Sequence, residues 1–137
     1  MTSLSKLQDF IDANLSQVDM RVDSLGDREA VFTYVVGADD IGHGNAVSGP
    51  AIMKLADTAF YLLLLAELGF DTALAASSLN FSFLRKPSAD LNLRAHCRLL
   101  KVGRRLIVGD MAIFSEGDEH PAVHATGTYT PLAGDGA

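Results

Sequence analysis

Residues 49–68 read GPAIMKLADTAFYLLLLAEL, and this stretch decides the fold. Ser48 is a favoured helix cap, the following Gly-Pro is tolerated in a first turn, and Gly69 stands where a helix would end. The expected helix is apolar on nearly every side, so other elements must surround it. One residue interrupts the apolar pattern, because Asp57 places a carboxylate in the middle of the helix.

The segments on either side of this helix supply its covering. An amphipathic helix is expected near residues 3–15. Strand patterns follow in the order 20–23, 29–36, 75–84, 91–99, 105–114 and 122–130, with clean alternation at Leu91, Leu93, Ala95, Cys97 and Leu99. In a chain of this length, an antiparallel sheet formed by these strands is the only structure that can cover the helix. The predicted class is therefore α+β, a hotdog fold in which the sheet wraps a long central helix after a short N-terminal helix.

Length and composition limit the remaining possibilities. The 137 residues predict one domain over 1–137, with the N-terminal helix within about 1–16 and a flexible tail at about 133–137. A net charge of −6 argues against nucleic acid as a partner. The longest apolar run, residues 59–66, is far shorter than the roughly 20 residues of a membrane span. The single Cys97 and the absence of a signal-like N-terminus indicate a cytoplasmic protein.

Asp57 admits a structural and a functional interpretation. Lys54 lies one turn earlier on the same face, so the two side chains could form an ion pair. The functional interpretation adds Gly49, because backbone N–H groups at a helix start can polarise a carbonyl that is becoming negative. Eight residues of helix separate Gly49 and Asp57 by about 12 Å, too far for one carbonyl. If both act on one substrate, they come from two chains that meet in a dimer.

The stretches SGPAIMKLADTA and SLNFSFLRKP resemble the phenylacetate-degradation type of hotdog acyl-CoA thioesterases, over roughly residues 40–130. The resemblance implies hydrolysis of an acyl-CoA thioester by a homodimer, commonly a dimer of dimers, with no metal or other cofactor. It implies that Gly49 polarises the carbonyl and that Asp57 acts as general base or nucleophile. Ser77 and Ser78 fall near a family position that helps to place the attacking water.

The sequence departs from the family pattern at the start of the helix. Ser48 replaces the His of the family's His-Gly-Gly, and Pro50 replaces its second Gly. Ser48 can still form a hydrogen bond, so we expect it to support Asp57 and Gly49 in catalysis. The family's Asn position falls on Gly42, so Asn45 could serve only through a shifted loop. Coenzyme A carries phosphates, for which cationic side chains at strand ends and turns are candidates: Arg85, Lys86, Arg104, Arg105 and, in the glycine-rich loop, His43.

Two other functions fit the same fold. His43 lies 14 residues before Asp57, a spacing similar to that of the hydroxyacyl-thioester dehydratases and isomerases, although the loop lacks their Gly-His-Phe-Pro sequence. A non-catalytic acyl-CoA-binding module is the other alternative, because a fold does not fix an activity. The sequence selects neither the acyl group nor the carrier, which is coenzyme A or an acyl carrier protein.

Overall fold

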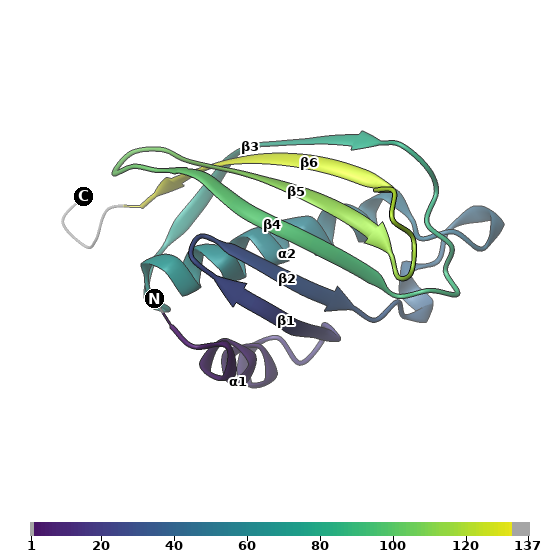
Figure 1. Ribbon diagram of the computed structural model, residues 1–137, viewed down its shortest axis with the longest axis horizontal. Coiled ribbons are helices and arrows are strands. Elements are labelled where there is room, and N and C mark those ends of the chain that lie inside the picture. Colours follow the sequence, from purple (N-terminus) through teal and green to yellow (C-terminus); the bar gives the residue numbers. More distant parts are fainter. Residues whose placement is uncertain (1, 133–137) are drawn as a thin grey trace.

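The computed structural model describes residues 2–132, and the predicted tail at 133–137 lies outside them. Helix α1 (Leu4–Asn14) precedes strands β1 (Met20–Gly26) and β2 (Glu29–Tyr34). The long helix α2 (Gly49–Leu68) follows, and the remaining strands are β3 (Leu74–Phe83), β4 (Leu93–Val102), β5 (Ile107–Ser115) and β6 (Val123–Pro131). Figure 1 shows the sheet curving around α2, with α1 beneath β1. The predicted hotdog fold is confirmed.

The order of the strands could not be read from the sequence. The described strands form one antiparallel sheet in the order β1-β2-β4-β5-β6-β3, so the chain leaves α2 and crosses to the far edge before it returns. Strand β4 buries every second side chain from Leu93 to Leu99, as the alternation predicts. Leu91 does not join that face, because it precedes the strand and is exposed.

Helix α2 is less enclosed than its composition predicts. The sheet buries one broad side of the helix, including Ile52, Leu55, Ala59, Phe60 and Leu63. A stripe along the other side remains exposed, and we call Met53, Lys54, Asp57 and Tyr61 the α2 stripe. Met53 is 43% exposed and Tyr61 37%. The sequence-based expectation of a helix surrounded on all sides is therefore wrong for the single chain.

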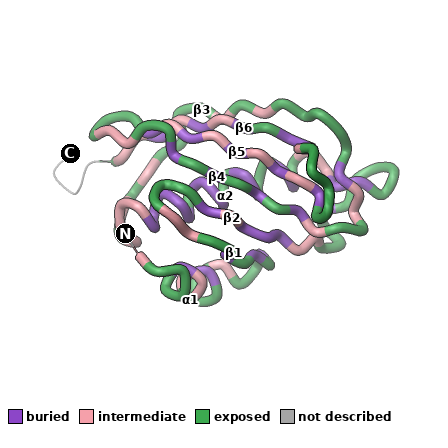
Figure 2. Tube along the Cα trace, in the orientation of Figure 1, coloured by how far each residue is buried: buried purple, intermediate pink, exposed green. Residues whose placement is uncertain are grey.

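The two edges of the sheet differ in their covering. At β1, the Gln8 side chain of α1 accepts a hydrogen bond from the Val22 N–H (2.8 Å) and donates one to the Met20 carbonyl (3.3 Å). At the opposite edge, β3 is exposed or half-buried along its whole length, and Figure 2 shows it mostly in the colour of exposed residues. A long uncovered edge strand offers a row of backbone groups for pairing.

Two glycines let α2 approach the sheet closely. Gly109 of β5 and Gly127 of β6 are paired in register, and the fully buried ring of Phe60 lies over both. A Cβ atom at Gly109 would lie 2.9 Å from the Arg98 carbonyl oxygen and 3.0 Å from Phe60 Cε1. A Cβ at Gly127 would lie 3.1 Å from Phe60 Cε2. The glycine pair therefore sets the depth of the helix.

We expect Gly109→Ala to lower the free energy of unfolding by about 1–3 kcal/mol, because the new methyl group overpacks the site under Phe60. Chemical denaturation of the variant and the wild type measures the difference. Gly49→Ala is the matched control, since a Cβ there meets nothing within 4 Å. Equal stability of the two variants would show that the glycine pair does not limit the helix position.

Candidate active site

The loop before α2 is held by a buried carboxylate. Asp40 Oδ2 accepts hydrogen bonds from the Tyr34 hydroxyl (2.7 Å) and the Gly37 N–H (2.8 Å). The backbone carbonyl of Asp40 accepts from the Ser48 N–H (2.8 Å), directly at the helix cap. Burial, and then the Asp40 carboxylate, raises the pKa of Tyr34 well above its usual range, so its hydroxyl remains a donor. Sequence reasoning missed Asp40, because nothing distinguishes it from the adjacent Asp39 before the loop is folded.

The start of α2 leaves one N–H without a partner. Ser48 caps the helix, and its Oγ accepts from the Ala51 N–H (3.2 Å). Pro50 has no N–H, and the Ile52 N–H makes the first regular helical bond to the Ser48 carbonyl (3.1 Å). Among the described residues, the Gly49 N–H has no hydrogen-bond acceptor. The sequence-based prediction of an open donor at Gly49 agrees with this geometry.

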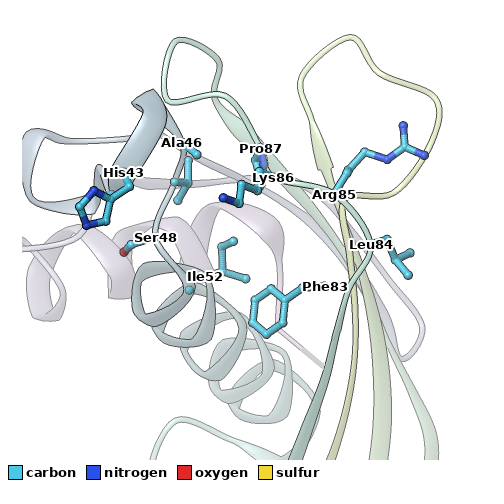
Figure 3. Close-up of a pocket in the computed structure, with 12 residues that line it drawn as sticks. His43, Ala46, Ser48, Ile52, Phe83, Leu84, Arg85, Lys86 and Pro87 are labelled. Carbon is cyan, nitrogen blue, oxygen red and sulfur yellow. The ribbon is translucent and has the colours of Figure 1, made fainter.

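A pocket of about 490 Å³ opens beside this donor. One side is lined by Gly42, His43, Ala46, Val47, Ser48, Gly49 and Ile52. The other side is lined by Phe83, the last residue of β3, and by residues 84–87 after it. Figure 3 shows the rings of His43 and Phe83 on opposite sides of Ser48 and Ile52. The Val47 N–H donates to the Pro87 carbonyl (2.8 Å) and joins the two walls. The pocket is largely apolar in lining, with His43 and Ser48 near the helix start and Arg85 and Lys86 on the opposite wall.

Asp57 does not line this pocket. It is exposed on the α2 stripe, and its Oδ1 accepts a hydrogen bond from the Tyr129 hydroxyl of β6 (3.1 Å). No ion pair joins Asp57 to Lys54 within residues 2–132, so the predicted alternative of a structural pair is not what the fold provides. Sequence reasoning missed Tyr129, although the alternation along β6 places it on the face toward α2.

Three other predicted residues lie apart from the pocket. Asn45 is exposed with a positive φ of 54°, and its carbonyl accepts from Ala89 (2.8 Å). Ser77 sits at a β-bulge, and its hydroxyl lies 2.9 Å from that of Thr130. Thr130 follows Tyr129 and points to the opposite face, so Ser77 is turned away from Asp57 of the same chain. The hydroxyl of Ser78 accepts from the Asn80 amide (3.0 Å).

The predicted cations divide into two groups. Arg85 and Lys86 line the pocket, although Figure 3 shows Arg85 extending away from Ser48. The Arg85 guanidinium lies 3.8 Å from the Asp118 carboxylate. Arg104 and Arg105 lie in the β4–β5 turn, at the other end of the sheet. The length of β4 separates this turn from the pocket by about 30 Å. The structure therefore does not bring Arg104 and Arg105 to the pocket of their own chain.

Within residues 2–132, no group of three His, Cys, Asp or Glu side chains is placed to hold a metal ion. None of the helices in that range is long and apolar enough to cross a membrane.

Comparison with known proteins gives the family. A model of the thioesterase superfamily matches residues 44–122, which is more than half of the chain and includes the end of the loop, α2 and the pocket wall at residues 83–87. The chain therefore belongs to the thioesterase superfamily, and it is a thioester hydrolase. No curated protein matches the chain.

Solved structures agree with this assignment. A thioesterase assigned as putative, from a Silicibacter species, is 32% identical over 97% of this chain and 94% of its own, with a TM-score of 0.89. A variant of the phenylacetic acid degradation protein PaaI from Thermus thermophilus is 25% identical over 90% and 99%, with a TM-score of 0.72. A hypothetical thioesterase from Streptococcus pneumoniae, solved with coenzyme A, shares the fold at 16% identity over 84% and 90%, with a TM-score of 0.74.

We expect Tyr34→Phe to lower the free energy of unfolding by about 1–3 kcal/mol, because the buried Asp40 carboxylate loses a hydrogen-bond donor. Denaturant titration measures the loss. Tyr61→Phe is the matched control, since the Tyr61 side chain is exposed on the α2 stripe. An equal effect of the two changes would contradict the role given to Asp40.

Proposed function

We propose that the protein is an acyl-CoA thioesterase whose active site is completed by Asp57 of a second copy. The observation that carries the proposal is the unshared Gly49 N–H, which opens on the apolar pocket at the helix start. Such a donor stabilises the oxyanion that forms when a thioester carbonyl is attacked. The family supplies the reaction class, and the pocket supplies room for an acyl group.

The need for a second copy follows from the helix itself. Gly49 and Asp57 belong to one rigid helix and stand about 12 Å apart along its axis, whereas reacting groups approach within about 3–3.5 Å. The uncovered β3 edge and the α2 stripe lie on the part of the molecule that would pair in a two-fold dimer. Phe83, 48% exposed, and Met53, 43% exposed, would gain cover there. A dimer of dimers would contain the same two-chain active site within each dimer.

The proposed reaction is a hydrolysis in two steps. Asp57 of the partner subunit takes a proton from water while the water oxygen forms a bond to the thioester carbon. The carbonyl oxygen becomes an oxyanion and accepts from the Gly49 N–H. The C–S bond then breaks, the oxyanion re-forms the carbonyl, and the thiolate of coenzyme A receives the proton from the Asp57 carboxyl. The acid and the free thiol leave.

The pocket mouth supports the choice of coenzyme A as the carrier. Lys86, Arg85 and His43 are basic side chains that line it, and phosphates of a bound nucleotide would meet them there. The Streptococcus thioesterase of the same fold was solved with coenzyme A, which favours that carrier over an acyl carrier protein. The acyl group itself would occupy the apolar part of the pocket, between Ile52 on one wall and Phe83 and Leu84 on the other.

We expect Gly49→Pro to lower kcat by about 10²–10³-fold, because it removes the oxyanion donor. Proline suits the site, since Ser48 is already extended (φ −69°, ψ 153°) and open space surrounds the glycine. Gly49→Ala keeps the N–H and is expected to keep most of the activity. Thiol release from a panel of acyl-CoA esters measures both variants, and equal losses would contradict a role for the N–H.

If the wild-type protein releases thiol from none of the acyl-CoA esters in the panel, the proposed function is overturned. Hydration of an enoyl-CoA, with His43→Ala as its control, would then test the dehydratase alternative, which is kept because His43 lines the same pocket as Gly49. Acyl-CoA binding without turnover would support the non-catalytic module.

Mixed dimers test whether the site is shared between chains. Asp57→Asn is expected to lower kcat by about 10²–10⁴-fold, through loss of the base. When it is co-expressed with Gly49→Pro, each mixed dimer regains one intact site. Random assortment makes half of the dimers mixed, so activity should return to about a quarter of wild type. Failure of two inactive parents to complement would show that Gly49 and Asp57 do not act across chains.

A further inference from the structure

We propose that Tyr129 is a positioning residue for Asp57: it holds Oδ1 and leaves Oδ2 to exchange the proton with water and the leaving thiolate. This inference rests on the proposed function. The Tyr129 hydroxyl donates to Asp57 Oδ1 at 3.1 Å, and no other hydrogen bond to the Asp57 carboxylate occurs within residues 2–132. One oxygen is thus engaged and the other is open.

The tyrosine ring is itself fixed by packing. Tyr129 is only 4% exposed and lies on the face of β6 toward α2. Its ring packs against Phe60 with centroids 5.9 Å apart and planes at 59°. Phe60 and Asp57 are three residues apart on α2, so one ring contacts both. The hydroxyl therefore reaches the carboxylate from a side chain that packing has already oriented.

Gly127, one of the glycine pair described above, also makes room for this ring. A Cβ atom at Gly127 would lie 3.0 Å from Tyr129 Cε1, closer than ordinary van der Waals contact. Gly127, which helps to set the depth of Phe60, thus also leaves room for the Tyr129 ring. The packing of the sheet therefore positions Tyr129 for its contact with Asp57.

The electrostatic environment keeps the phenol protonated. Burial, and then the Asp57 carboxylate, raises the pKa of Tyr129 well above its usual range, so the hydroxyl donates throughout the working pH range. The nearest other charge on α2 is Lys54, whose ammonium group forms no ion pair within the described residues. The thiol of Cys97, on the inner face of β4, is kept neutral by burial, which raises its pKa.

We expect Tyr129→Phe to lower kcat roughly ten- to a hundred-fold and to leave KM nearly unchanged, because the acid retains its place but loses its orientation. In an Asp57→Asn background the same change should have no effect. An unchanged kcat in Tyr129→Phe, with active wild type, would overturn the inference and leave the thioesterase intact.

A measurement that needs no turnover tests the pair directly. With tyrosine labelled by ¹³C at Cζ, the Tyr129 signal in Asp57→Asn should move from its wild-type position, because the hydroxyl loses its carboxylate acceptor. An unchanged signal would overturn the pairing, whereas failure of thiol release with the signal moved would overturn the proposed function alone.

Discussion

The arrangement of the candidate active site depends on how closely helix α2 can approach the sheet. Because Gly109 and Gly127 carry no side chains, the Phe60 ring rests almost on the backbone of β5 and β6. Any larger residue there would lift α2 away. At this depth, the start of the helix meets the loop that Asp40 holds, and its middle meets the hydroxyl of Tyr129. Both halves of the candidate chemistry are thus fixed by one packing contact.

Helix α2 is also rigid, and its rigidity assigns the two proposed catalytic groups to different active sites. The donor at Gly49 and the carboxylate at Asp57 keep their separation whatever the loops do. The sheet covers the side of α2 that needs burial and leaves the Asp57 side open, together with the β3 edge. An arrangement of this kind is incomplete for the proposed chemistry in one chain and complete in two.

Much of this could be predicted, because the signals are local. The apolar run of α2, the Ser48 cap and the alternation in β4 each depend on residues near one another in sequence. The exposed α2 stripe was missed, since composition says how apolar a helix is but not how far a sheet reaches around it. Asp40 and Tyr129 were missed because each acts through a contact that only the folded topology creates. The placement of Ser77 turned on a bulge, which shifts a strand's faces without leaving a clear mark in its sequence.

The wall of the pocket formed by residues 83–87 begins with the last residue of β3 and continues directly from that strand. In the proposed dimer, β3 is also the strand along which the two copies meet. The same short segment of the chain would then determine both subunit assembly and substrate choice. A mutation that reshapes the pocket there would also affect subunit pairing, and natural selection would act on both effects. New specificities in this lineage would therefore arise more readily on the opposite wall, in the loop before α2.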